Sequence, residues 1–369
     1  LINPFPNGFQ YPLGAKGGLS TNLGQGVAFF DQNMRYPYMQ RWQFSLQREL
    51  IAKSVIEMSY VGNRGTRQRS ARQYNPIPRP YLSTSPVRDQ EAINFLGANG
   101  PNPFYPMLPG TSLAGANVAR SQLLRPYPQF TSVLADTNQA YSWYHSLQVR
   151  YDKRFSSDLS TSVSYTWSRL MEARTFLNET DATPEEVVSD QDRTHRLAVT
   201  WIYQLPFGGG RAFGKGWGRP LNAALGGWQV QGIYTGQSGP PLGFGNSIFA
   251  GDLKKVPLPN SERSVERWFN VNAGFERDSR KALGSNLRGL SSRFAGIRGD
   301  GQNNWDLSLI KNGRLTERFQ LQFRAEAINA LNHAQFLTPN VNPTSTAFGQ
   351  VSSEWSWPRV IQFGIKLLF

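Results

Sequence analysis

A glycine-rich segment, Gly209 to Lys215, is the part of the chain most similar to a site for chemistry. Its spacing resembles the start of a phosphate-binding loop, in which backbone amides surround the phosphates and a lysine neutralises them. Gly216 stands where such a loop needs a serine or threonine to hold magnesium, and we expect a strand rather than a helix beyond it. We therefore interpret the segment as a flexible connector and not as a nucleotide site.

Residues suited to hydrolysis or metal binding are equally sparse. Ser238 lies in a Gly-Gln-Ser-Gly run, which lacks the second half of a nucleophile elbow. The chain has no cysteine, and its three histidines are far apart without the spacing of zinc ligands: His145, His195 and His333. A serine triad brought together by folding stays open, although no motif favours it. We expect no enzyme activity, no cofactor and no metal.

Asp300 takes part in two short polar signals. It ends an Arg-Gly-Asp tripeptide of the kind used in cell adhesion, and more oxygen donors follow at Asn303, Asn304 and Asp306. Calcium prefers six to eight oxygens around a curved loop, and no such spacing repeats here. We interpret this stretch as a polar loop that enters a strand.

The chain is strongly basic, with a net charge of +14 and a pI near 10.1. Clustered lysine and arginine can neutralise nucleic-acid phosphates, but here no helix carries a basic stripe. The basic residues are instead spread through expected loops, most densely at Arg64, Arg67, Arg69 and Arg72. We expect no nucleic-acid partner, and we hypothesise that the positive loops attract lipopolysaccharide phosphates.

Composition limits how the chain could meet a membrane. Its 369 residues are 13% aromatic, which is enough to bury a large core, yet the mean hydropathy is −0.46. No run of about 18 apolar residues occurs, so a transmembrane helix is excluded and only a β-barrel could cross a bilayer. The chain begins with Leu1, and its first thirty residues lack a leader pattern, so we expect an internal start with any signal peptide upstream.

Period-two alternation is the strongest pattern in the sequence. Leu159, Val163 and Tyr165, for example, alternate with serine and threonine, as on a strand with one apolar face. The alternation predicts nine strands, several of them long enough to cross a membrane at a tilt. They span about 38–50, 53–61, 141–155, 159–169, 194–205, 227–237, 303–312, 318–330 and 359–369.

Connection lengths orient these strands. If the C-terminal end is periplasmic, the extracellular set is uniformly long: 1–37, 62–140, 170–193, 238–302 and 334–358. The opposite set is short at 51–52, 156–158 and 313–317 and long only at 206–226. Aromatic residues at strand ends fit two membrane interfaces: Tyr38, Trp143, Tyr144, Trp167, Tyr203, Phe207, Trp228 and Trp357. Ordinary core packing is the alternative for any one of them.

Several segments carry a more specific resemblance. They are residues 40–50, 60–65, 144–148, 165–168, 226–230, 303–309 and 324–333, together with an apolar last strand that ends in Phe369. Over essentially the whole chain they resemble the Oar-like TonB-dependent transporters of the Gram-negative outer membrane. The terminal Phe369 is similar to the signal that outer-membrane assembly machinery recognises.

The resemblance implies a plugged barrel of about 22 strands that draws energy from the inner membrane through TonB. Residues 1–369 then form the C-terminal part of an antiparallel up-and-down transmembrane barrel, an all-β fold. About 22 minus 9, or about 13, strands are missing, together with the N-terminal plug and the TonB box.

We therefore expect outer-membrane transport of a ligand that the sequence does not name. Charged residues expected to face the lumen are Arg41, Arg150, Lys153, Arg324 and Glu326, and we hypothesise that Arg324 and Glu326 form ion pairs with the plug. Membrane lipid, lipopolysaccharide, the plug, TonB and the assembly machinery are the expected partners. A surface adhesive or structural barrel and a soluble carbohydrate-binding protein are the alternatives.

Overall fold

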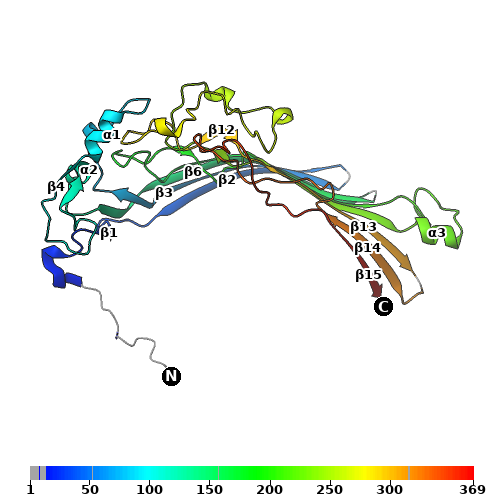
Figure 1. Cartoon of the computed structure of the whole chain (residues 1–369). Coiled ribbons are helices and arrows are strands. Elements are labelled where there is room, and N and C mark those ends of the chain that lie inside the picture. The colour runs from blue at the N-terminus through cyan, green and yellow to red at the C-terminus, as the bar shows by residue number, and fades with distance from the viewer. Residues whose placement is uncertain (1–7, 9–13, 52, 157, 315) are drawn as a thin grey trace.

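One long antiparallel sheet dominates the molecule (Figure 1). A computed structural model of the chain describes residues 8, 14–51, 53–156, 158–314 and 316–369. Nine strands follow one another across the sheet in chain order, each antiparallel to the next. They are β2 (Tyr38–Leu50), β3 (Ser54–Gln73), β6 (Ser132–Ser156), β7 (Leu159–Ala173), β9 (His195–Gln204), β10 (Trp228–Gln237), β13 (Gln302–Arg314), β14 (Gln320–Ile328) and β15 (Val360–Leu368).

The nine predicted strands are therefore confirmed, with their order along the chain preserved in the sheet. Tight connections join β2 to β3, β6 to β7 and β13 to β14 at one end, which we call the turn end. Each predicted turn there includes one residue outside the described set, at positions 52, 157 and 315. The long connections, apart from 205–227 between β9 and β10, lie at the opposite end, which we call the loop end.

Two strands are much longer than the alternation predicts. The segment 62–140, expected to be a loop, continues β3 to Gln73 and starts β6 at Ser132. Arg67 has a φ of 56°, and the β3–β6 register shifts on both sides of Gln68. A bulge of this kind inserts an extra residue, so the side-chain alternation is broken while the hydrogen-bonded ladder continues. Arg64, Arg67, Arg69 and Arg72 thus lie on a strand and not in a loop.

Smaller elements decorate the loop end. β1 (Gly26–Phe30) pairs in parallel with β6, and β8 (Val187–Val188) pairs with β7. The other elements at this end are β4 (Asn99–Pro101), β5 (Asn117–Ala119), β11 (Pro241–Leu242), β12 (Phe294–Arg298), α1 (Gln90–Gly97) and α2 (Arg120–Leu123). The helix α3 (Arg219–Leu225) lies instead at the turn end. No helix in the described ranges is long and apolar enough to cross a membrane.

The register gives the sheet two chemically different faces. Directly opposed residues share a face, and one such row runs Leu46, Met58, Val149, Tyr165 and Leu197 across five strands. This apolar face is exposed: Phe363 and Ile365, which lie on it in β15, retain 72% and 74% of their accessible surface. The adjacent row of Gln47, Glu57, Arg150 and Ser164 belongs to the opposite, polar face.

Two expected orientations are wrong in this register. Lys153 lies opposite Thr161, which is itself opposite Trp201, so Lys153 belongs to the apolar face and not to the polar one. Tyr144 lies opposite Asn63 and therefore points to the polar face. Lys153 lies near the end of β6 and Tyr144 lies in its middle. Strict alternation from Val149 and Tyr151, and from Trp143 and His145, places each of them on the face that the register shows.

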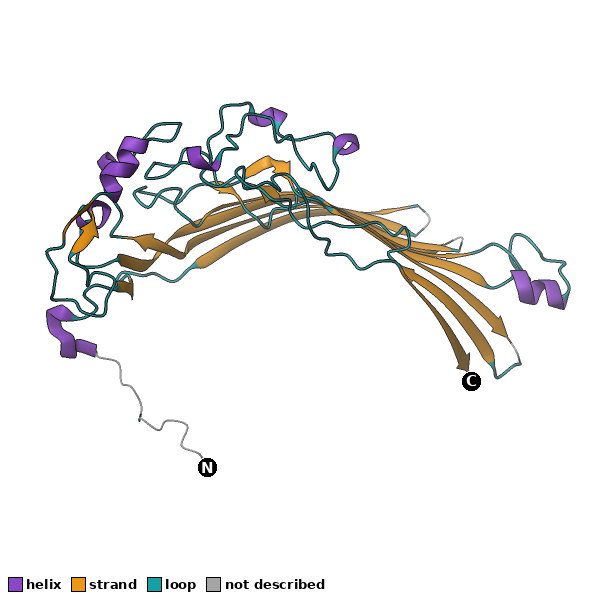
Figure 2. Ribbon diagram, in the orientation of Figure 1, coloured by secondary structure: helices purple, strands orange, loops and turns teal. Residues whose placement is uncertain are grey.

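The main hydrophobic core lies in the loops and not in the sheet. Leu242, Phe244, Val256, Trp268, Phe269, Phe275, Ile297 and Phe348 are buried together. All but Phe348 come from the connection 238–301, and Phe348 comes from the connection 329–359. Figure 2 shows these loops gathered above the arched sheet. Two connections thus fold as one packed unit.

Candidate functional site: the polar face and the loop assembly

A hollow of about 770 Å³ lies on the polar face of the sheet. Its charged lining residues come from β6, β13 and β14: Arg150, Asp152, Lys153, Arg154, Asp306 and Glu326. Lys153 is among them, although its register position belongs to the apolar face. Arg150 Nε lies 2.7 Å from Asp152 Oδ2, and Gln362 Nε2 donates to Glu326 Oε2 at 2.7 Å. The hollow carries charged groups of both signs together with apolar residues such as Trp201 and Leu307, which suits contact with a protein surface or with water.

The register places the expected polar-face residues as follows. Arg150 and Glu326 both line the hollow. Arg324 shares a strand face with Glu326, lies opposite Gly364 and donates from Nε to Gln322 Oε1 at 2.7 Å. Arg41 lies opposite Asn63, nearer the loop end. The sequence-based list of charged polar-face residues did not include Asp152 and Asp306, although both lie at alternating positions that could have identified them.

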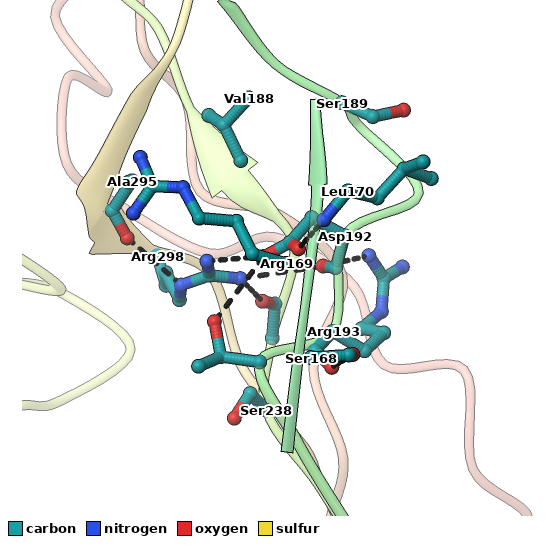
Figure 3. Close-up of polar contacts among 12 residues, drawn as sticks. Ser168, Arg169, Leu170, Val188, Ser189, Asp192, Arg193, Ser238, Ala295 and Arg298 are labelled. Carbon is teal, nitrogen blue, oxygen red and sulfur yellow. Dashed lines mark hydrogen bonds and ion pairs between the residues drawn. The ribbon is translucent and has the colours of Figure 1, made fainter. Parts of the chain in front are cut away.

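A buried ion pair connects two of the loops (Figure 3). Arg298 Nη2 lies 2.6 Å from Asp192 Oδ2, and the Asp192 side chain is only 1% exposed. Asp192 also accepts from the backbone N–H of Leu170 at 2.7 Å, while Arg298 donates to the carbonyls of Gly239 and Ala295. Burial, together with the nearby charge of Arg298, lowers the pKa of Arg193.

Further contacts fasten the same two loops along their length. Arg293 Nη2 lies 2.5 Å from Glu172 Oε1, and both side chains are largely buried. Glu185 accepts from the Ser291 hydroxyl at 2.7 Å, and Asn178 accepts from the backbone N–H of Arg288 at 2.7 Å. The connections 174–194 and 238–301 therefore form a single assembly, which we call the loop assembly together with the connection 329–359.

The loop assembly contains a second hollow of about 870 Å³. Its lining combines aromatic and polar side chains, with Trp268 and Phe336 beside Arg263, Asp300 and His333. Asp300 Oδ2 accepts from the backbone N–H of Phe336 at 2.8 Å, which joins the connection 329–359 to the rest. This hollow offers hydrogen-bonding groups for a ligand at the loop end.

The short motifs take structural roles. Arg298 of the Arg-Gly-Asp tripeptide is held by Asp192, so its guanidinium is not offered to a receptor. After the glycine-rich segment comes the helix α3 and not, as expected, a strand, and Asn222 of that helix accepts from the backbone N–H of Gly209 at 2.7 Å. Among the described residues no group of three metal-binding side chains occurs.

A sheet with an exposed apolar face on one side and a charged face on the other defines an integral membrane protein whose strands form a barrel wall. The sequence matches the model of the outer membrane beta barrel domain over residues 1–362, and the chain belongs to that family. Its location is the outer membrane. The alternative of a soluble carbohydrate-binding protein is therefore wrong.

Solved outer-membrane transporters have similar structures at low sequence identity. The transporter YddB from Escherichia coli is 9% identical over 94% of this chain and 34% of its own, with a TM-score of 0.43. The FrpB iron transporter from Neisseria meningitidis is 10% identical over 93% and 33%, with a TM-score of 0.40. The chain thus spans about a third of their lengths. No curated protein matches the sequence.

Proposed function

We propose that this chain is part of the wall of a TonB-dependent transporter, which moves a large or scarce ligand across the outer membrane. The observation that carries the proposal is the polar face with its charged hollow. A wall that faces lipid on one side needs charged groups such as Asp306 and Glu326 on the other only where that side meets water or protein. The sequence segments that resemble the Oar-like transporters support the finer assignment to that branch.

The proposed partners follow from the two faces and the two ends. A plug packs against the polar face and connects to TonB at the inner membrane. Lipid and lipopolysaccharide cover the apolar face. The C-terminal Phe369, which is 96% exposed, presents the signal for assembly. The hollow beside Trp268 and His333 is where we place first contact with the ligand.

The transport proposal is tested with the complete natural protein in planar bilayers containing potassium chloride. A plugged transporter conducts poorly, and removal of its lumen-filling domain opens a large conductance. The same protein should retain the purified periplasmic domain of TonB on an affinity column. A permanently open barrel that does not retain TonB contradicts the proposal.

Glu326 offers a test of how the polar face meets the plug. Glu326→Lys reverses a charge beside Arg324, and we expect the plug to become at least about tenfold more sensitive to protease, because a lost charge pair at a contact costs on the order of 2 kcal/mol or more. Glu262→Lys, in an exposed part of the connection 238–301, is the matched control. Unchanged plug retention and unchanged uptake in Glu326→Lys would refute an ion pair with the plug.

A surface adhesive barrel is the second candidate, and the packed loop assembly favours it. Loops that share a core of eight buried residues form a preorganised surface, which a glycan or a protein could bind without transport. The two candidates differ in their need for energy. Cells that lack TonB lose a transporter's uptake but keep an adhesin's binding.

A further inference from the structure

The apolar face changes composition toward the loop end in the same way on neighbouring strands. Along β3 it runs from Met58 through Tyr60 to Arg64, and along β7 from Tyr165 through Trp167 to Arg169. On β6 the sequence on this face is Leu147, His145, Trp143. Aromatic and basic side chains therefore replace aliphatic ones where a barrel leaves the hydrocarbon and enters the headgroups.

Two arginines in this band have no acidic partner within the described part of the chain. Arg64 lies opposite Trp143, and Arg169 lies opposite His145, so the two flank β6 from its two neighbours. Arg69, further along β3, is instead paired with Asp136 at 2.5 Å. Arg169 makes only a weak contact from Nε to the sulfur of Met171 at 3.3 Å. Both guanidinium groups keep donors for an external anion.

The histidine between them is held in place. Tyr60 Oη and His145 Nδ1 lie 2.7 Å apart, with the two rings stacked at an interplanar angle of 19°. The contact engages Nδ1, and the His145 side chain as a whole is exposed, so Nε2 is the ring nitrogen left for a ligand. Trp42 lies over Gly62, where any Cβ would come within 2.3 Å of the indole nitrogen, so the indole rests close to the strand beside His145.

Arg64, His145 and Trp42 contribute to a shallow hollow of about 230 Å³ on the lipid-facing surface. It is lined by Trp42, Trp143, Arg64, His145, Tyr141 and Glu186. Glu186 is the acidic member, and one of its oxygens is occupied by the Tyr141 hydroxyl at 2.5 Å. The two indoles of Trp42 and Trp143 wall the hollow. Arg169 is not part of the lining but lies on the next strand, opposite His145, so the hollow together with Arg169 carries more positive than negative charge.

We propose that this hollow binds the phosphate-bearing headgroup of a phosphorylated glycolipid of the outer leaflet. Arg64 and Arg169 donate to phosphate oxygens, His145 donates from Nε2, and the two indoles pack against the sugar and the first acyl carbons. Neighbouring strands are about 4.8 Å apart, so two long side chains on either side of β6 can reach one headgroup. The proposal rests on the outer-membrane location and is independent of transport.

The test measures binding of bisphosphorylated lipid A to the complete protein in detergent by native mass spectrometry. Arg64→Gln and Arg169→Gln are each expected to weaken binding about tenfold, since a hydrogen bond to a charged group is worth about that factor. Arg196→Gln is the matched control, because Arg196 lies near the same end of β9 but on the polar face, opposite Thr166. All variants must show heat-modifiable migration, which reports a folded barrel.

Each outcome decides the question. Loss in both lipid-face variants, retention in Arg196→Gln and no displacement by millimolar inorganic phosphate support a lipid site. Displacement of lipid A by inorganic phosphate alone means a free-anion site and overturns the proposal. Equal loss in Arg196→Gln means general charge attraction, and unchanged binding in Arg64→Gln and Arg169→Gln means that the hollow is not the site; both results overturn the proposal too.

Discussion

The ion pair of Arg298 and Asp192 is the residue-scale feature on which the loop assembly most depends. Asp192 is almost fully buried and accepts hydrogen bonds from both a side chain and the backbone of β7. A buried pair of this kind adds little net stability compared with an apolar pair. Removal of one partner is costly, however, because it leaves the other charge buried without a partner. Its role is therefore to determine how two loops fit together.

Replacement of Asp192 by asparagine should loosen the connections 174–194 and 238–301. The uncompensated charge of Arg298 costs about 3 kcal/mol, which corresponds to about a hundredfold faster proteolysis within these loops. Asp278→Asn is the control, because its partner Arg280 is 88% exposed and such surface pairs are worth about 1 kcal/mol or less. Equal protease sensitivity in the two variants would show that the buried pair has no special part in loop packing.

At the scale of elements, the long connections behave as a small folded unit attached to the sheet. Phe244 has ring contacts with Phe269, Phe275, Phe294 and Phe348, with centroids 4.5 to 6.1 Å apart. Aromatic pairs in these tilted and edge-on arrangements stabilise a core beyond the area they bury. The loop end is thus preorganised, which lowers the entropic cost of binding a ligand there.

Phe269→Ala should unfold this unit while the barrel wall persists. Loss of a buried phenylalanine costs about 3 to 5 kcal/mol, which is a large share of the stability of a unit held by one core of eight buried residues. Hydrogen exchange measured by mass spectrometry should rise in residues 238–301 and 340–351 and stay unchanged in β6 and β7. Phe213→Ala, at an exposed site in the connector before α3, should change neither region.

At the scale of the whole molecule, one sheet separates lipid from a polar interior. Backbone polar groups cannot stay unpaired in hydrocarbon, so the strands must pair continuously wherever they cross it. Alternation then assigns each side chain to one of two solvents. The two faces of a single strand should for this reason tolerate charge very differently.

Adjacent positions on β7 give a direct comparison of the two faces. Val163→Arg places a charge on the lipid side and should reduce the free energy of unfolding in vesicles by about 2 to 4 kcal/mol. Ser164→Arg, one residue along and on the polar face opposite Arg150, should reduce it by less than about 1 kcal/mol. Urea titration of the complete protein measures both, and equal effects would contradict the assignment of the faces.

Alternation alone was sufficient to predict most of the wall. The runs around Val149, Tyr165 and Leu309 have a strict period of two, because each side chain must match either lipid or water. The candidate polar-face residues Arg150 and Glu326 were identified for the same reason. The pattern failed at the bulge near Arg67, where an extra residue breaks the alternation. At Lys153 the expectation followed the charge of the side chain and not the alternation, which places Lys153 on the same face as Val149.

The sequence by itself thus determined the strand count, the strand order and the two faces, because these follow from contacts between neighbours in the chain and from the choice of solvent. Only the tertiary structure decided that Phe348 completes a core with Phe269, that Arg298 finds Asp192, and that Arg64 and Arg169 flank one histidine. These contacts join residues tens to about a hundred positions apart, and no local period encodes which loop meets which. The antiparallel sheet makes these contacts possible, because it brings the ends of separate strands together at the loop end, where the loops pack against one another.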